Sequence, residues 1–317
     1  MKEFEEVVKK LKAIKAKRVF VQFPEGLKLK IQNISDDLER EGFEVVLCME
    51  RVYGGCDVRE DEAKRLKCDA ILHIAHEEFD VKSKLPVVYW DYFINVDPLP
   101  ALEKEFHKLD AFKKIGLVTS LQFVHTLPKV AKYLESHGKK VFIHKSLQFS
   151  GQMLGCRVEA GLAIEKKVDA FLCVSAGKFY PLGLAIRTNK TVLDLDLERQ
   201  QIHDMKEQKM CVKKIVEWNK AQLKEAKKVG LIVSWKRGQM FGNPDKIKQQ
   251  LESQGKKVYI LSFDEFDSEK IEGLKLDVLI NFACPRIGTD DLERIKIPLL
   301  NWYDIYPQIK GKSKEKA

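Results

Sequence analysis

The sequence predicts an α/β protein of three repeated domains, each a small parallel sheet flanked by helices. Short apolar runs alternate with helical stretches along the chain, and this alternation favours parallel sheets that are covered on both faces. A strand, a helix and a second strand occur three times in the same order, which indicates an internal repeat. The length of 317 residues also suits several compact units better than a single core.

The first repeat is expected over residues 1–110. It opens with an amphipathic helix over 1–18, whose apolar residues lie on one face and dock it on the domain surface. The remaining pattern predicts strands at 17–23, 42–49, 68–76 and 86–90, with helices at 27–41 and 60–66.

The same order returns in a second repeat over 111–220 and in a third over 221–317. In the second repeat we expect strands at 113–119, 138–143, 168–174 and 191–194, with a helix at 127–136. In the third repeat we expect strands at 228–233, 255–260, 276–282 and 297–302, with a helix at 245–254. A long helical stretch spans 199–226.

Composition narrows the class of protein and its partners. The chain has 56 basic and 47 acidic side chains, a net charge of +9, and most of these alternate in sign on predicted helix faces, as on a solvated surface. We therefore expect no direct nucleic-acid partner. No apolar run approaches the roughly 18 residues of a membrane span. The mixed Glu and Lys of the first helix are unlike a signal or transit peptide, so a cytoplasmic protein is expected.

Seven cysteines without a secretory signal indicate reduced thiols rather than a disulfide framework. Four of them have a structural explanation as small hydrophobic residues within predicted strands or helices: Cys48, Cys68, Cys173 and Cys211.

The other three cysteines follow strands at tight turns and suit metal ligation. Cys56 lies in Tyr-Gly-Gly-Cys-Asp, Cys156 in Leu-Gly-Cys-Arg and Cys284 in Ala-Cys-Pro-Arg. Cys56 and Cys156 come after the second strand of their repeats, whereas Cys284 comes after the third strand of its own. All three still fall at the carboxyl edge of a parallel sheet, where ligands bind. We expect each repeat to deliver one thiolate to a site where the domains meet.

Counting ligands favours one type of metal centre. Structural zinc normally has four ligands, often in closely spaced pairs, and the chain has no such pair. Three thiolates suit a 4Fe-4S cluster with one open iron. Two questions stay open. The three cysteines could be buried loop residues that bind no metal. His76 could be a fourth ligand, or else a hydrogen-bonded histidine of the core or cleft.

These motifs, together with Phe-Pro-Glu-Gly-Leu at 23–27 and Gly-Gln-Met-Leu-Gly-Cys-Arg at 151–157, resemble the diphthamide-synthase family of radical 3-amino-3-carboxypropyltransferases. The resemblance covers nearly the whole chain. It implies that Cys56, Cys156 and Cys284 hold a 4Fe-4S cluster whose open iron binds S-adenosylmethionine. It further implies a transferase that breaks the bond from sulfur to the methionine γ-carbon, and that transfers the 3-amino-3-carboxypropyl group to a histidine of translation elongation factor 2, the first step of diphthamide biosynthesis. A homodimer and an external electron donor are implied as well.

Several polar and glycine residues near these motifs are candidates for binding S-adenosylmethionine. Arg157 and Arg286 suit a two-point contact with its carboxylate, or else a structural bridge to Asp57 or Asp290. Glu25 and Gly26 offer a carboxylate and an open backbone, or else only a turn. The motif around Cys56 adds three further candidates: Gly54, Gly55 and Asp57.

Two other functions are kept as alternatives. A quinolinate-synthase-like dehydratase shares the triplicated architecture with one cysteine per domain around a 4Fe-4S cluster, although its motifs differ from those of this chain. A non-catalytic metal-binding assembly protein with zinc, or without metal, is the second. Iron and absorbance near 400 nm in anaerobically prepared protein would distinguish an iron-sulfur enzyme from it.

Overall fold

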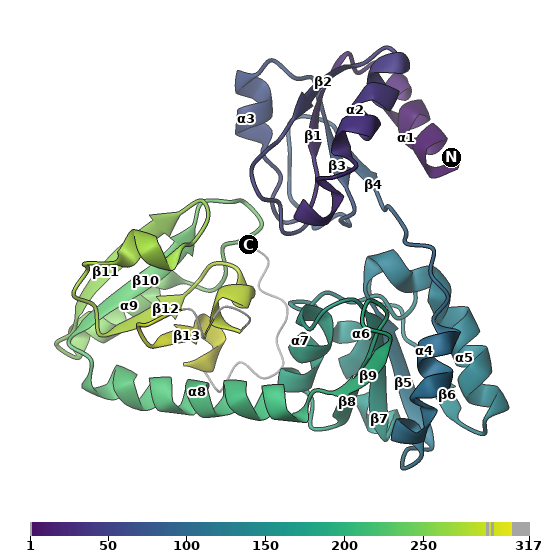
Figure 1. Ribbon diagram of the computed structural model, residues 1–317. Helices are drawn as coiled ribbons and strands as arrows, with labels where there is room; N and C mark the ends of the chain where they lie inside the picture. Colours follow the sequence, from purple (N-terminus) through teal and green to yellow (C-terminus); the bar gives the residue numbers. More distant parts are fainter. Residues whose placement is uncertain (1, 290–291, 293–294, 306–317) are drawn as a thin grey trace.

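The computed structural model describes residues 2–289, 292 and 295–305, and this part of the chain folds into three sheets with helices on their faces (Figure 1). The sheets have the strand orders β2-β1-β3-β4, β6-β5-β7-β8-β9 and β11-β10-β12-β13. All neighbouring strands in these sheets are parallel except β8 and β9. The predicted α/β fold of three repeated sheets is therefore confirmed.

The first sheet lies between helices on its two faces. Its strands are β1 (Arg18–Gln22), β2 (Glu44–Leu47), β3 (Ala70–Ile74) and β4 (Val87–Trp90), and its helices are α1 (Lys2–Ala13), η1 (Glu25–Leu27), α2 (Ile31–Arg40) and α3 (Glu60–Arg65). Because strand side chains alternate between faces, Val19 and Val21 pack with α1 and α2, whereas Phe20 packs with Ala63 of α3.

The second sheet follows the same plan and adds a fifth strand. Its strands are β5 (Lys114–Thr119), β6 (Lys140–Phe142), β7 (Ala170–Ser175), β8 (Thr191–Asp196) and β9 (Gln201–Asp204). Leu117 packs with α4 (Leu99–Lys104) and α5 (Leu127–Ser136), whereas Val118 faces α6 (Glu159–Leu162) and α7 (Phe179–Arg187). Short 3-10 helices complete this repeat: η2 (Phe106–Leu109), η3 (Leu121–Thr126) and η4 (Glu165–Lys167).

The long helix α8 (Lys206–Glu225) runs along the lower edge of Figure 1 from the second sheet to the third. The third sheet has strands β10 (Lys228–Ser234), β11 (Lys257–Phe263), β12 (Val278–Asn281) and β13 (Leu299–Asn301), with α9 (Pro244–Ser253) on one face. Ile232 on the other face packs with Val212 of α8. The 3-10 helices here are η5 (Ser268–Ile271), η6 (Pro285–Gly288) and η8 (Trp302–Asp304).

One aspartate shows the repeat at atomic level. Asp69 precedes β3 and accepts hydrogen bonds from the backbone N–H groups of Lys17 and Arg18 at 3.0 to 3.2 Å. Asp169 and Asp277 accept the same pair of bonds from the two backbone N–H groups at the start of β5 and β10. Each aspartate thus ties the start of the third strand of its repeat to the start of the first.

The structure corrects three expected helices. The helix expected over 1–18 ends at Ala13, because Arg18 already begins β1. The helix expected over 199–226 begins only at Lys206, because Gln201–Asp204 forms the antiparallel strand β9, in which the buried Ile202 pairs with Leu195 of β8. The helix expected over 27–41 is split into the 3-10 helix η1 and the α-helix α2. The domain limits at 110 and 220 stay a prediction, since α8 crosses the second of them.

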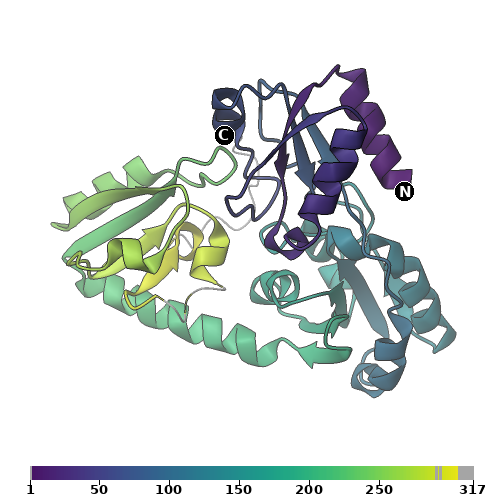
Figure 2. The same ribbon diagram turned by 45° about the horizontal axis from the view of Figure 1, so that its top comes forward.

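In the turned view the first repeat lies above the second, and the third repeat lies beside them at the far end of α8 (Figure 2). The repeats touch through polar contacts of loops at the sheet edges. Gln122 of η3 donates a hydrogen bond to the carbonyl of Ala75 at 2.7 Å, and Lys236 of the third repeat reaches Asp57 of the first. Among the described residues, no helix is both long and apolar enough to cross a membrane.

Candidate metal centre

The structure brings Cys56, Cys156 and Cys284 together from three repeats. Cys56 lies on the loop after β2, Cys156 on the loop between β6 and α6, and Cys284 directly before η6. Burial, with an added contribution from the neighbouring thiol of Cys284, raises the pKa of the Cys56 thiol to about 12. Burial also raises the pKa of Cys156 to about 12, and here Cys56 adds to the effect. The thiols are thus close enough to repel one another as thiolates.

These raised pKa values suit a site that is completed by a cation. Without a metal the thiols hold their protons at neutral pH, whereas iron displaces the protons and compensates the clustered negative charge. Within the part of the chain that the structure describes, no three His, Cys, Asp or Glu side chains lie close enough together for a single metal ion. In an iron-sulfur cluster each ligand sulfur binds a different iron, so wider spacing is required. The donor set therefore fits a three-cysteine cluster.

Two glycines let chain segments approach Cys56 closely. A Cβ atom on Gly55 would lie 1.9 Å from the carbonyl oxygen of Glu77, so that the backbone of the motif rests directly on residue 77. A Cβ on Gly238 would lie 2.5 Å from the carbonyl oxygen of Cys56. Gly54 is less constrained, because its Cβ would lie at ordinary contact distance, 3.4 Å, from Cys56 Sγ.

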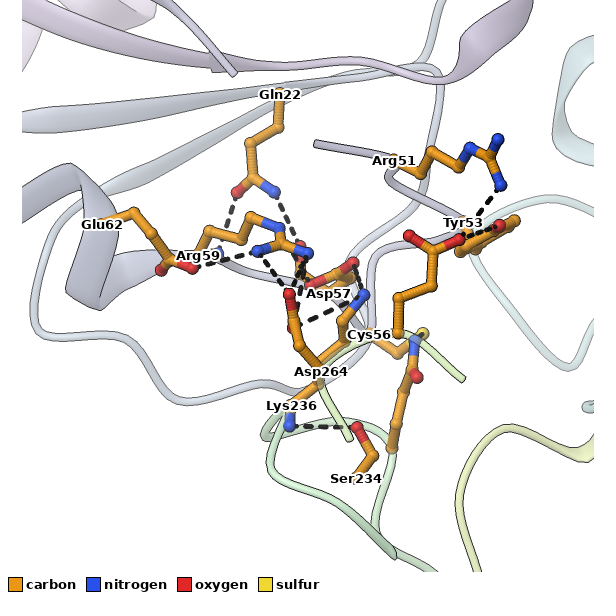
Figure 3. Close-up of polar contacts among 12 residues, drawn as sticks. Gln22, Arg51, Tyr53, Cys56, Asp57, Arg59, Glu62, Ser234, Lys236 and Asp264 are labelled. Carbon is orange, nitrogen blue, oxygen red and sulfur yellow. Dashed lines mark hydrogen bonds and ion pairs between the residues drawn. The ribbon is translucent and has the colours of Figure 1, made fainter. Parts of the chain in front are cut away.

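A buried ionic network joins the Cys56 loop to the third repeat (Figure 3). Lys236 Nζ lies 2.7 Å from Asp57 Oδ2, and both side chains are almost fully buried. Arg59 pairs with Asp264 of the third repeat at 3.2 Å and with Asp57 at 3.6 Å. Gln22 donates a hydrogen bond from Nε2 to the carbonyl of Asp57 at 2.8 Å. Asp57 therefore serves this network rather than an open cavity.

The third repeat also contacts Cys56 itself. The backbone N–H of Gly238 donates to the carbonyl of Cys56 at 3.1 Å. Gln239 Nε2 lies 3.5 Å from Cys56 Sγ and donates a hydrogen bond to it. Earlier in the same loop, Tyr53 donates from its hydroxyl group to Glu265 of the third repeat at 2.7 Å.

A cavity of about 690 Å³ is lined by all three repeats and by α8. Glu25 and Gly26 of η1 contribute to its wall, and Tyr53, Phe179 and Arg286 form another part. The guanidinium of Arg286 lies 4.5 Å from the ring centroid of Phe179 and 5.7 Å from that of Tyr53. The cavity thus combines a carboxylate, a guanidinium and aromatic rings next to two of the cysteine loops.

His76 also lines this cavity and is hydrogen-bonded to a second histidine. Its Nδ1 lies 3.1 Å from Nε2 of the buried His73. Burial lowers the pKa of His76 to about 4, so the ring is neutral at physiological pH. The sequence allowed two roles for His76, a fourth metal ligand or a hydrogen-bonded histidine of the cleft. Its contact with His73 agrees with the second role.

Arg157 lines a different cavity, of about 820 Å³, together with Glu77, Tyr89 and residues of α1. Its guanidinium lies 3.8 Å from the ring centroid of Phe79 and 3.8 Å from Asp80. The structure therefore does not bring Arg157 and Arg286 into one cavity. Asp57 pairs with neither arginine, and Asp290 lies outside the described residues.

The remaining cysteines behave as expected with one exception. Cys48, Cys68 and Cys173 are buried, which agrees with a structural role. Cys211 is exposed on α8 and lines the cavity of about 690 Å³, so the burial expected for it is wrong. On this solvent-facing turn of the helix, tertiary packing does not enclose the side chain.

Sequence reasoning missed the residues of the third repeat that surround Cys56. Lys236, Gly238 and Gln239 follow β10, the first strand of that repeat. The corresponding loop of the first repeat, at 24–26, follows β1 and holds the candidates Glu25 and Gly26. The internal repeat is therefore the signal that indicates 235–239, because this segment follows β10 as 24–26 follows β1.

Comparison with known proteins gives one consistent family. The profile of the diphthamide synthesis protein family matches residues 23–316. A 2-(3-amino-3-carboxypropyl)histidine synthase of Pyrococcus horikoshii is 31% identical over 300 residues, which cover 93% of this chain and 86% of that protein. The synthase of Methanocaldococcus jannaschii is 29% identical over 303 residues, covering 89% and 81%.

A solved structure agrees with these sequence relatives. The crystal structure of Dph2 from Pyrococcus horikoshii with a 4Fe-4S cluster superposes with a TM-score of 0.83 at 30% sequence identity. The match covers 95% of this chain and 88% of that chain. The fold and the presence of an iron-sulfur cluster in that relative agree with the three-cysteine arrangement described above.

Proposed function

The chain belongs to the diphthamide synthesis protein family, and on that premise we propose that it is a 2-(3-amino-3-carboxypropyl)histidine synthase. The reaction converts S-adenosylmethionine and a histidine of a protein into methylthioadenosine, a 2-(3-amino-3-carboxypropyl)histidine and a proton. The names of the relatives favour this transferase over a dehydratase or a non-catalytic assembly protein.

The observation that carries the proposal is the meeting of three thiols from three repeats. Cys56, Cys156 and Cys284 would each bind one iron of a 4Fe-4S cluster and leave the fourth iron open. When bound and reduced, such a cluster supplies the electron that breaks the bond between the sulfur of S-adenosylmethionine and its γ-carbon. The residues of the chain bind the substrate and orient it.

The cavity of about 690 Å³ is the proposed site for S-adenosylmethionine. Arg286, held against Phe179 and Tyr53, suits a two-point contact with the methionine carboxylate. Glu25 supplies a negative charge for the α-ammonium group or the sulfonium, and the backbone at Gly26 is open to a ligand. Arg157 lines the other cavity and is left out of this site.

Gly55 and Asp57 support the Cys56 loop. Gly55 lets the motif rest on residue 77, and Asp57 links the motif to Lys236 of the third repeat. We propose that these two residues fix the position of Cys56 rather than contact the substrate, whereas Gly54, whose Cβ would meet Cys56 Sγ only at 3.4 Å, is not required for that position.

The protein substrate proposed for the reaction is translation elongation factor 2, modified on imidazole C2 of one histidine. The proposal includes a homodimer, an external electron donor and a cytoplasmic location, as the family resemblance and the sequence suggest. A mass measurement by light scattering tests the homodimer, since a monomeric mass at working concentration contradicts it.

The test of the function is an anaerobic reaction of the reconstituted, reduced protein with carboxyl-labelled S-adenosylmethionine and elongation factor 2. The expected products are methylthioadenosine and label bound covalently to the elongation factor. Formation of 5′-deoxyadenosine alone would contradict the proposal, since it reports cleavage of a different carbon-sulfur bond.

A further inference from the structure

The segment 235–239, which follows β10 in the third repeat, contacts the Cys56 loop and the start of α3 through three consecutive residues. Lys236 pairs with Asp57 at 2.7 Å, and Arg237 pairs with Glu60 at 2.6 Å. The N–H of Gly238 donates to the carbonyl of Cys56 at 3.1 Å. This segment therefore contacts both the Cys56 motif and the first residue of α3, and its last residue reaches the sulfur.

Gln239 is the residue that contacts Cys56 Sγ. Its side chain is only 5% exposed, and Nε2 donates a hydrogen bond to the sulfur at 3.5 Å. Its own backbone N–H donates to the carbonyl of Lys236 at 2.9 Å, so the backbone that carries it is fixed by a turn. The absence of a Cβ on Gly238 lets the segment approach closely enough, since that atom would lie 2.5 Å from the Cys56 carbonyl oxygen.

A hydrogen bond to a cysteine sulfur that binds a cluster has a defined electronic effect. The donor withdraws electron density from the sulfur and stabilises the reduced, more negatively charged state of the cluster. The effect is stronger in a buried site, where water does not compete for the sulfur. Gln239 adds this donor without adding a charge.

We propose that Gln239 is a positioning residue of the third repeat that orients Cys56 Sγ and raises the reduction potential of the bound cluster. The inference rests on the cluster in the proposed function. It concerns a residue that acts through Cys56 and does not contact the substrate.

The test compares Gln239→Leu with a matched variant, Gln122→Leu. Both changes replace an amide by an apolar group of similar size, and both remove a hydrogen bond between repeats. Gln122 donates to the carbonyl of Ala75 at 2.7 Å and not to a sulfur. Full-length protein is reconstituted anaerobically with iron and sulfide, and the midpoint potential is measured by a redox titration followed by electron paramagnetic resonance.

We expect the midpoint potential of Gln239→Leu to be more negative than that of the wild type. The expected loss is about tenfold in the one-electron reduction equilibrium, which corresponds to roughly 59 mV. We expect Gln239→Glu to shift the potential further in the same direction, because it places a carboxylate beside the sulfur. The potential of Gln122→Leu should equal that of the wild type.

Each other outcome is informative. A full cluster with unchanged potential in Gln239→Leu overturns the inference, and so does an equal shift in Gln122→Leu, which would report a general loosening of the repeats. Loss of the cluster from Gln239→Leu alone supports the role in orienting Cys56. A wild-type protein that binds no iron under these conditions instead overturns the proposed function, so the two failures are distinguishable.

Discussion

Lys236 Nζ lies 2.7 Å from Asp57 Oδ2, and the two side chains are 4% and 2% exposed. The pair joins the residue after Cys56 to the loop after the first strand of the third repeat. Removing either charge alone leaves its partner buried in a poorly compensated state. The position of Cys56 thus depends on the contact between the first and third repeats, and not on the local turn alone.

A double-mutant cycle measures the strength of this coupling. Lys236→Met should lower the free energy of unfolding by about 3–5 kcal/mol, because Asp57 then keeps only Arg59 at 3.6 Å. Asp57→Asn combined with Lys236→Met should be less destabilising than the sum of the single changes. Urea denaturation measures the free energy of unfolding of the wild type, the two single variants and the double variant. The exposed pair of Lys12 and Glu41 is the control, and Lys12→Met should cost less than about 1 kcal/mol. Strict additivity in the buried pair would contradict this interpretation.

Gly55 and Gly54 should respond differently to the same small change. Gly55→Ala places a Cβ 1.9 Å from the backbone oxygen of Glu77, so the Cys56 loop must move. We expect this variant to lose most of its reconstituted iron and at least about 2 kcal/mol of stability. Gly54→Ala meets Cys56 Sγ at 3.4 Å and should retain the iron. Equal iron contents in the two variants would show that the contact with residue 77 does not position the loop.

The two candidate arginines should separate in binding S-adenosylmethionine. Arg286→Lys removes the planar fork from the proposed cavity, and we expect about a tenfold higher dissociation constant, or about 1.4 kcal/mol. Arg157→Lys alters the other cavity and should change the dissociation constant less than twofold. Calorimetry with the reconstituted, unreduced protein measures both. A larger increase of the dissociation constant in Arg157→Lys than in Arg286→Lys would instead assign S-adenosylmethionine to the cavity of about 820 Å³.

Asp194 should make stability depend on pH. Its side chain is 1% exposed and accepts a hydrogen bond from Ser175 Oγ at 2.6 Å, and burial raises its pKa from 3.8 to about 7. Between pH 4 and 7 the folded protein binds a proton that the unfolded chain releases, so the stability from this group falls as the pH rises. Asp194→Asn should therefore gain up to about 4 kcal/mol relative to wild type above pH 7, and almost nothing below pH 4. A constant difference across this range in urea unfolding would exclude the raised pKa.

The sequence predicted the sheets well because their strands are short apolar runs in a repeated order. The central strands β1, β5 and β10 fell inside the expected runs or within one residue of them, since buried parallel strands carry a strong apolar signal. The strand β9 was missed because only Ile202 is buried in it and its partner lies earlier in the chain. A polar edge strand beside a long helix gives little local signal.

The candidate site was predictable only in part. Cys284 lies three residues after β12, whereas Cys56 and Cys156 lie nine and fourteen residues after β2 and β6, so the expected position directly after a strand holds for Cys284 alone. The surroundings of Cys56 depend instead on contacts across about 180 residues, as between Asp57 and Lys236 or between Cys56 and Gln239. No local periodicity encodes such pairs. Likewise, Arg157 and Arg286 each follow a cysteine motif but line different cavities, which the sequence pattern does not distinguish.

The most direct test of the central claim is the iron content and electron paramagnetic resonance signal of five single variants reconstituted anaerobically in parallel. Cys56→Ala, Cys156→Ala and Cys284→Ala should each lose the intact 4Fe-4S cluster. Cys48→Ala and Cys173→Ala, which remove buried thiols at the core of the first and second repeats, should keep the wild-type iron content and signal. A full cluster in all three of the first variants would show that these thiols are not its ligands.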